Sequence, residues 1–492
     1  GAGLQGPVAR MSEAVRRWWG WASLALLLLA TPLLLFPAGW RLWALAVIPL
    51  IALGHCLAVG CWLPRTPLDL PILLLLLMVG VSALVTYSLE VSLPKIAGVI
   101  LGVTWFYVVS HLGRRRSGWW VCLLLFLGAG FGVAALGLVG TQWGRKIPAL
   151  EPVLTRLPVQ LDGLPGAESG FNPNEVAGAL LWVIPPCAVL LLATLRNSLR
   201  LSAARGFLFA VCSLLFLLLA TVLVTGTFVL TQSRIAYLAL ALTLVLLGLA
   251  ALPARGRWLV LVALALFLAG FGAAVASQRL PDPVQVLFPD QESPDSLLAV
   301  RSLEGRVEIW SRALLGIQDF LFTGMGMNTF RRVVHVLYPM TRFSPSVDIA
   351  HAHNEFLQAA LDLGVPGLIA FTALHIIAFW MLSQVRRGAP PCALPAPLSH
   401  NDSPAEAAGA VAQPPLSHSG AYGRGAGGEG PLTLALAGGL LAHMLYGLAD
   451  AIALGAKPGV LFWMLLGLIA SLHHRTCARD PSPPSPSRND FR

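Results

Sequence analysis

The chain has 492 residues, of which 56% are hydrophobic and only 11% are charged, and its mean hydropathy is +0.74. This composition excludes a water-soluble globular protein and predicts one that crosses a lipid bilayer several times. The formal net charge of +10 comes from short basic clusters between apolar runs, which argues against a nucleic-acid partner. The seven cysteines suggest neither a disulfide framework nor a metal-type spacing.

Apolar runs long enough to cross a hydrocarbon core as helices recur along the whole chain. The alternating pattern of a transmembrane β-barrel is absent from the sequence. We therefore predict an all-α polytopic membrane protein with about twelve transmembrane helices. The runs lie near residues 20–38, 42–62, 70–88, 92–112, 118–140, 177–195, 206–230, 235–252, 258–276, 360–383, 431–449 and 459–473.

Arginine clusters set the expected orientation, because short loops rich in Lys and Arg stay in the cytoplasm. The clusters at Arg16–Arg17, Arg114–Arg116 and Arg386–Arg387 all fall on one side of the predicted spans. We therefore place both termini in the cytoplasm, and the polar segments 141–176 and 277–359 on the outer face.

The spans divide the chain into segments with different expected roles. Residues 1–10 precede Met11, which looks like a natural start, so we expect them to be a cloning remnant outside the fold. Segments 384–430 and 474–492 are poor in large apolar residues, which predicts disordered cytoplasmic segments. The remaining plan is nine spans in 11–276, an outer loop with a helix and catalytic residues in 277–359, a tenth span in 360–383 and two more in 431–473.

A histidine-rich stretch runs from His351 into the tenth span. Histidine can exchange a proton near neutral pH, and Asn354 beside His353 can bind substrate or hold the ring. A histidine that merely caps a span at the interface is the plainer alternative. The spacing of His353-Asn354 to Gly364 and Gly367 favours a chemical role.

Two arginines on the outer side are candidates for binding an anion. Arg234 begins the eighth span at its outer end, where the charge rule does not expect a cation. Arg306 opens a stretch whose apolar spacing, at Val307, Ile309, Trp310, Leu314 and Ile317, predicts an amphipathic helix lying on the membrane. The alternative for each is a long side chain that reaches the lipid headgroups.

These three segments together resemble the O-antigen ligase and polymerase superfamily. The resemblance rests on His353-Asn354, nine residues, Gly364, two residues and Gly367; on Thr-x-Ser-Arg-x-Ala around Arg234; and on Arg-x-x-x-Trp at Arg306. It implies a GT-C-like fold and inverting transfer of a glycan from undecaprenyl pyrophosphate, at the periplasmic face of a bacterial inner membrane. It further implies that neither a metal nor another cofactor is needed.

The resemblance also implies roles for individual residues. Arg234 and Arg306 would stabilise the negative charge that develops on the leaving pyrophosphate. His353 would take the proton of the acceptor hydroxyl, with His351 as a rival base and His335 as a weaker one.

Further polar residues near the outer face are candidates for binding substrate. They are Asn354 and His351 in the histidine-rich stretch, Lys95 in the fourth span, and His443 in the eleventh, with Asp450 just beyond it. Buried polar groups in spans tend to mark function, although structural pairing is the alternative for each.

The resemblance leaves the acceptor open, because the superfamily contains ligases, polymerases and enzymes that glycosylate protein. We favour an O-antigen ligase with lipid A–core as acceptor, since the outer loop is of moderate length and no further outer domain follows. A secondary transporter is the rival from another class, because about twelve spans suit it too. The sequence leaves the oligomeric state open.

Overall fold

The computed structural model describes residues 13–36, 39–60, 62–141, 143, 147–157, 170–198, 204–277, 303–387 and 429–478. Within these ranges the protein is nearly all helical, and its only β pairing is an isolated bridge between Thr141 and Phe171. In chain order the helices are α1 (Glu13–Leu35), η1 (Gly39–Ala46), α2 (Val47–Val59), α3 (Asp69–Val85), α4 (Leu89–Leu112), α5 (Arg116–Gly140), η2 (Pro148–Leu150), α6 (Glu151–Leu154), α7 (Pro173–Leu181), α8 (Ile184–Ser198), α9 (Ala204–Leu230), α10 (Arg234–Ala251), α11 (Ala254–Ala276), α13 (Leu303–Asp319), α14 (Phe330–Leu337), α15 (Glu355–Arg387), α16 (Glu429–Gly447), η4 (Lys457–Gly459) and α17 (Val460–Ala478).

Seven of the described helical segments are long and apolar enough to cross a membrane, or eight if the bent pair α7 and α8 counts as one span. The seven are Trp18–Leu35, Gly39–Ala58, Leu89–Leu112, Arg116–Gly140, Glu355–Arg387, Gly430–Gly447 and Lys457–Cys477. Shorter apolar helices lie in α3, α9 and α10. The prediction of a helical, polytopic membrane protein is thus confirmed, whereas the number twelve and the GT-C-like type stay predictions. Our expectations for residues 1–10, for 278–302 of the outer loop, for 388–428 and for the tail from 479 concern residues outside the described ranges.

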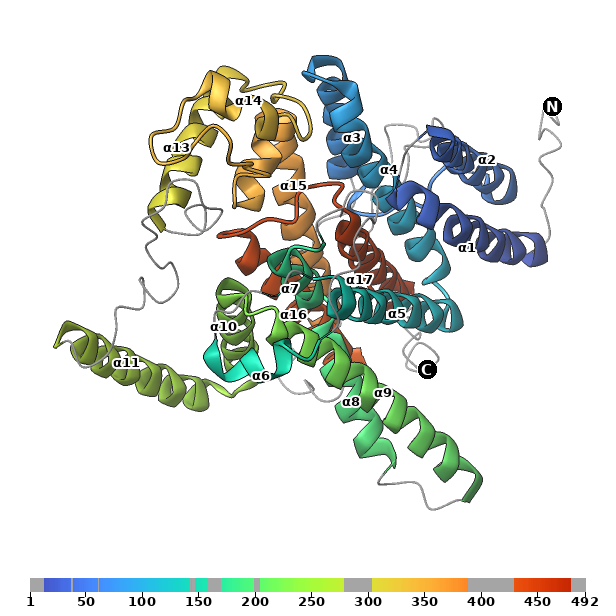
Figure 1. Cartoon of the computed structure of the whole chain (residues 1–492). Coiled ribbons are helices and arrows are strands. Elements are labelled where there is room, and N and C mark those ends of the chain that lie inside the picture. Colours follow the sequence, from blue (N-terminus) through green and yellow to red (C-terminus); the bar gives the residue numbers. More distant parts are fainter. Residues whose placement is uncertain are drawn as a thin grey trace, which may run out of the picture.

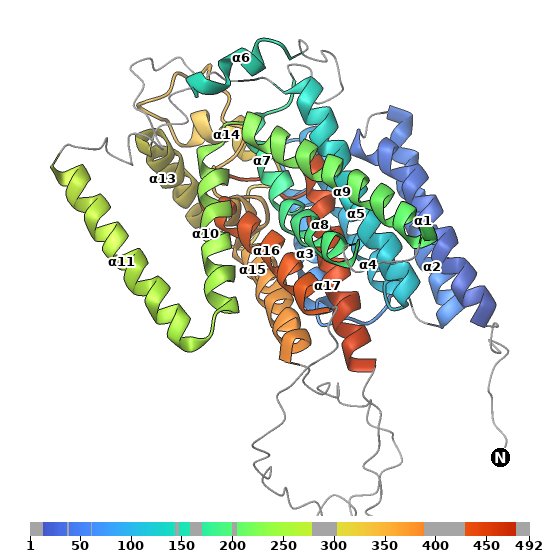
Figure 2. The same cartoon turned by 90° about the horizontal axis from the view of Figure 1, so that it is seen from below.

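Helices α4 and α17 form the centre of the bundle. They pack along each other, α1 covers α4, and α15 packs against α3 and α17 (Figure 1). The close approach depends on glycine, because a Cβ at Gly102 of α4 would lie only 2.0 Å from the Trp463 ring of α17. Helix α11 stands away from the bundle beside α10 in two perpendicular views (Figures 1 and 2).

The predicted sixth span is broken into two helices. The axes of α7 and α8 are bent by 46°. Pro185 and Pro186 stand in the first turn of α8, where the backbone N–H has no partner within the helix, so proline is tolerated there. At the other end of α7 the Asn172 side chain accepts a hydrogen bond of 2.9 Å from the Asn174 backbone N–H. Asn172 is therefore the N-cap of α7.

The segment between α11 and α15, which we predict to lie on the outer face, has a small core of its own. Helix α13 is present as predicted, but its apolar residues divide between two surroundings: Ile309 is fully buried, whereas Val307 is 53% exposed. Ile309 and Ala313 pack with Phe330 and Val334 of α14 and with Leu361 of α15. The helix therefore docks on α14 and α15 through one side, instead of lying only on a membrane surface.

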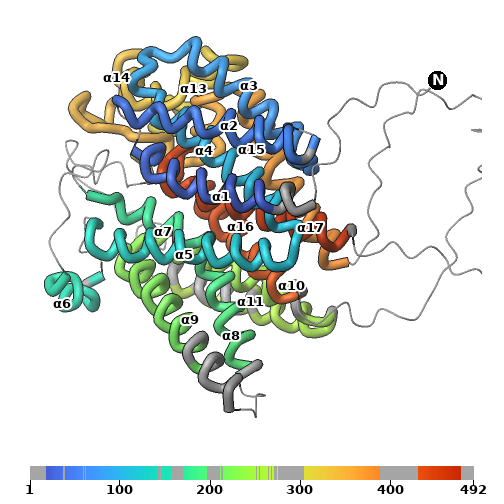
Figure 3. Tube along the Cα trace, turned by 90° about the vertical axis from the view of Figure 1, so that its right-hand side faces the viewer, coloured from blue at the N-terminus to red at the C-terminus, as the bar shows by residue number. Residues whose placement is uncertain are grey.

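The bundle has two distinct ends. Helices α6, α13 and α14 gather at one end, and the start of α1 and the last turns of α15 and α17 lie at the other (Figures 2 and 3). Since α4 runs through the centre, its first residues and its last residues belong to different ends. This division positions the candidate site.

Candidate active site

Three segments far apart in the chain meet at Asp450, which follows α16. The His353 Nδ1 atom lies 3.0 Å from Asp450 Oδ1, and Arg306 Nη2 of α13 lies 3.7 Å from Asp450 Oδ2. The side chains of Arg306 and Asp450 are only 4% and 2% exposed, and that of His353 is 12% exposed. An imidazole and a guanidinium thus share one buried carboxylate.

Neighbouring charges keep the Asp450 carboxylate ionised, and hydrogen bonds from Asn174 and Ala451 hold it in place. The Asn174 amide donates to Oδ2 at 2.9 Å, and the Ala451 backbone N–H donates to Oδ1 at 3.0 Å. Burial alone would raise the pKa of Asp450, but His353 and Arg306 more than offset it and hold the pKa below its usual range. An ionised carboxylate can only accept hydrogen bonds. The His353 Nδ1 atom therefore carries the proton, and Nε2 remains as the basic nitrogen.

The backbone at His353 has the left-handed conformation, with a φ of 48°, which is uncommon for a residue other than glycine. In this conformation the His353 backbone N–H donates to His351 Nδ1 at 3.2 Å, and the two ring centroids are 4.4 Å apart. Burial, together with the neighbouring His353, lowers the pKa of His351 to about 3. His351 is therefore neutral at physiological pH and acts as a support for His353.

Asn354 starts α15 and joins it to the Asp450 segment. Its side-chain oxygen accepts hydrogen bonds of 3.0 Å from the backbone N–H groups of Phe356 and Leu357, as a helix cap does. Its amide donates to the Leu448 carbonyl at 2.9 Å. The structure thus gives Asn354 a structural use, and its expected contact with substrate stays a prediction.

The two glycines that follow have separate structural reasons. Gly364 has a φ of 69° and interrupts α15, and a Cβ there would lie 2.7 Å from the Phe322 backbone. At Gly367 a Cβ would lie 2.2 Å from the Leu363 side chain. Gly364 therefore marks the place where the segment between α11 and α15 packs tightly against α15, whereas Gly367 makes room for the Leu363 side chain within α15 itself.

His443 lies within the bundle, next to Glu355. Its Nε2 atom lies 3.2 Å from Glu355 Oε2, its Nδ1 atom lies 3.0 Å from the Gly178 carbonyl, and its ring stacks on Trp182 with centroids 3.8 Å apart. These contacts tie α16 to α7 and α15. A direct role for His443 in binding substrate stays a prediction.

Lys95 and Arg234 belong to helices that border the same end of the bundle. Lys95 of α4 interacts electrostatically with Glu175 and Asp362 and with His351. Arg234 is half-buried at the first position of α10, and α10 packs against α16 and α7. The convergence of Arg234 with Arg306 on one ligand stays a prediction.

Ligand atoms of His351, His353 and Asp450 lie within 4.8 Å of one another, as the ligands of a metal ion would. Two observations disfavour that use. Arg306 places a positive charge beside the shared carboxylate, and His351 Nδ1 already accepts a hydrogen bond. The donor set therefore fits proton transfer better than cation binding.

The fold and the site define a polytopic membrane protein that gathers ionisable side chains at one end of its helices. Residues 219–372 match the family model described as O-antigen ligase. The match confirms the resemblance to the O-antigen ligase and polymerase superfamily that the sequence motifs carry. It includes Arg234, Arg306 and His353 but ends before Asp450. No curated protein matches the chain.

The sequence named His353 and Arg306 as catalytic candidates but placed Asp450 only among the polar residues near the outer face that could bind substrate. Its carboxylate joins the two, and nothing in the sequence links residues 306, 353 and 450. The one available signal was an acidic residue in a short apolar connection between two spans.

Proposed function

We propose that the protein is an O-antigen ligase, which transfers a glycan from undecaprenyl pyrophosphate to lipid A–core. The O-antigen ligase match supports activity of the ligase or polymerase type. The observation that carries the mechanism is the His353–Asp450–Arg306 group. It combines a base held by a carboxylate with a guanidinium in one buried place.

His353 would remove the proton from the acceptor hydroxyl as the oxygen attacks the anomeric carbon. Asp450 fixes the ring through Nδ1, so Nε2 is the atom that takes the proton, and the carboxylate stabilises the imidazolium that forms. The new glycosidic bond forms as the bond to the pyrophosphate breaks. General bases of this kind typically contribute about 10²–10⁴-fold to the rate.

Arg306, with Arg234, would bind the pyrophosphate of the donor. Negative charge grows on the bridging oxygen as the glycan leaves, so a guanidinium there stabilises the transition state more than the ground state. Charged side chains take the place that a metal ion has in other phosphate chemistry, so we propose that transfer needs no cofactor. Lys95 lies close enough to His351 to add its charge to the positive field, whereas the neutral His351 would act through hydrogen bonds.

We further propose that the site faces the periplasm and that both termini are cytoplasmic. In a variant without its native cysteines, Ser346→Cys in the outer segment should react with an impermeant thiol reagent added to spheroplasts. Ser117→Cys at the start of α5 should react only after lysis. The reverse labelling pattern would mean that the protein has the opposite orientation in the membrane.

The rival transporter is less well supported. Transporters bind substrate near the bilayer midplane, whereas the charged groups here lie just before α15, just after α16 and near the start of α4. Their gathering at helix ends fits a reaction at the membrane face.

The test is a reaction with purified protein, undecaprenyl-pyrophosphate glycan and lipid A–core, with and without a chelator. We expect lipid A–core to gain the glycan at the same rate in both. His353→Ala should lower the rate by about 10²–10⁴-fold while donor binding persists. Elongation of the lipid-linked glycan without transfer to lipid A–core would show that the protein is a polymerase and not a ligase. Loss of activity with the chelator would contradict the metal-free mechanism.

A further inference from the structure

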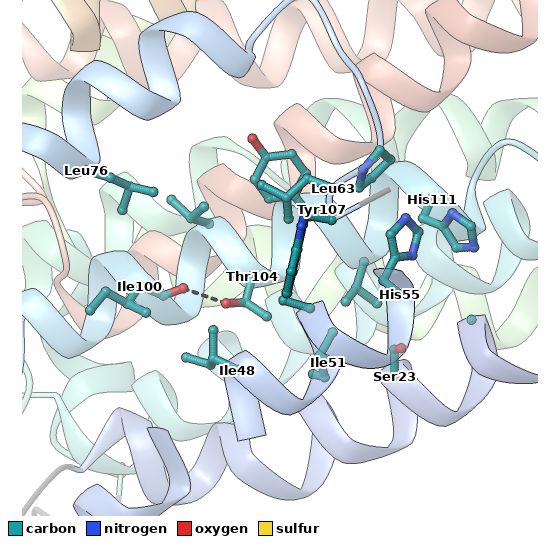
Figure 4. Close-up of a pocket in the computed structure, with 16 residues that line it drawn as sticks. Ser23, Ile48, Ile51, His55, Leu63, Leu76, Ile100, Thr104, Tyr107 and His111 are labelled. Atoms are coloured by element: carbon teal, nitrogen blue, oxygen red, sulfur yellow. Dashed lines mark hydrogen bonds between the residues drawn. The ribbon is translucent and has the colours of Figure 1, made fainter. Parts of the chain in front are cut away.

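A cavity of about 210 Å³ lies among α1, α2, α3 and α4. Figure 4 shows His55 and His111 side by side at one end of it and Ile48, Leu76 and Ile100 toward the other. From Lys95 to His111 the rise along α4 is about 24 Å at 1.5 Å per residue. The end of the cavity at His55 and His111 is therefore well separated from the candidate active site.

The walls of the cavity are apolar and belong to membrane helices. Ile48, Ile51, Leu76, Ile100 and Val103 line its inner part, and α1, α2 and α4 belong to candidate spans. Sites that enclose drug-sized molecules measure roughly 300–1,000 Å³. This smaller space suits a segment of one alkyl chain.

The end of the cavity near His111 is basic. The rings of His55 and His111 meet edge to face with centroids 4.7 Å apart. Both rings interact electrostatically with Arg114, and His111 also with Arg115. Within the described part of the chain, His111 Nδ1 is buried and has no hydrogen-bond partner. A polar atom is thus available beside a cluster of positive charge.

We propose that this cavity binds one acyl chain of an anionic phospholipid, with the headgroup phosphate at His111 and Arg114. An apolar space that ends in basic groups matches a lipid that has an alkyl chain and a negative phosphate. Trp62 lines the cavity and is exposed, and tryptophan is a residue type that gathers at membrane interfaces. Entry from the surrounding bilayer needs no aqueous path.

Native mass spectrometry of the purified full-length protein in detergent tests the proposal, with phosphatidylglycerol and phosphatidylcholine of identical chains as probes. We expect one phosphatidylglycerol to bind at least about fivefold more tightly than phosphatidylcholine, since one basic group near the headgroup supplies about that factor. Ala52→Phe, which fills the cavity, should abolish this binding. Leu77→Phe, on the exposed side of α3, should leave it unchanged.

Arg114→Gln probes the headgroup without altering the cavity and should weaken binding of phosphatidylglycerol about fivefold. Arg156→Gln, an exposed residue of the connection after α6, is its control and should have no effect. Equal binding of the two lipids would overturn the proposal, as would full retention by Ala52→Phe. Displacement of phosphatidylglycerol by a lower concentration of undecaprenyl phosphate would assign the cavity to a polyprenyl chain instead.

Discussion

The two ends of α4 border sites of opposite character. Near Lys95, buried charges are held by partners from α7, α13, α15 and the segment after α16. Near His111, an apolar cavity is built by α1 to α4, which follow one another in the sequence. Buried charge needs partners with defined geometry, whereas an apolar wall needs only volume. The first end should therefore be sensitive to single substitutions and the second tolerant of them.

Replacing Arg306 by lysine should lower the rate of glycan transfer far more than the same replacement of a surface arginine. A lysine keeps the charge but loses the planar fork of donors, and loss of one stabilising donor typically lowers kcat by about 10²–10³-fold. Arg342→Lys is the matched control, because Arg342 forms an exposed pair with Glu304 and surface pairs contribute little. Rates of glycan transfer measured for both variants check this, and a fully active Arg306→Lys protein would remove Arg306 from the mechanism.

Asp450→Asn should lower both the transfer rate and the stability. The rate should fall by at least about tenfold because the imidazole loses its anchor, and unfolding at pH 7 should become easier by about 3–5 kcal/mol because Arg306 stays buried without its counter-ion. The pKa of Asp450 is lowered in the fold. The stabilisation of the fold by the ionised Asp450 is therefore complete above the pKa of about 3.9 that aspartate has in the unfolded chain. It is lost as pH falls through the lower pKa of the folded state.

Thermal unfolding of both proteins between pH 8 and pH 3 measures this dependence. The gap in stability between wild type and Asp450→Asn should stay constant down to about pH 4 and narrow below it. Asp348→Asn, which alters an exposed ion pair with Arg331, is the control, and its stability should differ little from that of the wild type. A large gap that is unchanged at pH 3 would mean that the carboxylate charge is not what stabilises the site.

His351→Gln should have a smaller effect on rate, of about threefold to tenfold, because His351 supports His353 and takes no proton itself. Its pKa of about 3 in the fold lies below the unfolded value of about 6.5. The wild type should therefore lose stability as pH falls from 6.5, because only the unfolded chain binds the proton. Other histidines still contribute in His351→Gln, so its slope should be shallower than that of the wild type by the share of one proton. An unchanged or steeper slope in the variant would contradict the assignment.

The same contrast explains what the sequence could predict. Helices lie at the apolar runs because hydropathy and length are local properties. His353 and Arg306 were found because their motifs are short and contiguous. The carboxylate of Asp450 could not be assigned its role, because the contact joins residues 306, 353 and 450 through tertiary packing. The burial of Ile309 likewise depends on Phe330 and Leu361, which periodicity within one helix does not reveal.

Ala52→Phe should have the smallest effect on catalysis. It fills the cavity at the far end of α4 and leaves the groups around Asp450 unchanged, so glycan transfer should stay within about twofold of wild type. Leu77→Phe is again the control. Loss of transfer comparable to that of Arg306→Lys would show that the two ends are coupled.

The central claim is that Asp450 acts through His353, and a double-mutant cycle measures this directly. Transfer rates are compared for wild type, His353→Ala, Asp450→Asn and the double variant under single-turnover conditions. Residues that act as a unit are strongly non-additive. We predict that Asp450→Asn, which costs at least about tenfold in the wild type, costs less than about threefold once His353 is absent. An equal loss in both backgrounds would show that Asp450 contributes independently of the base, and the account of the site would be wrong.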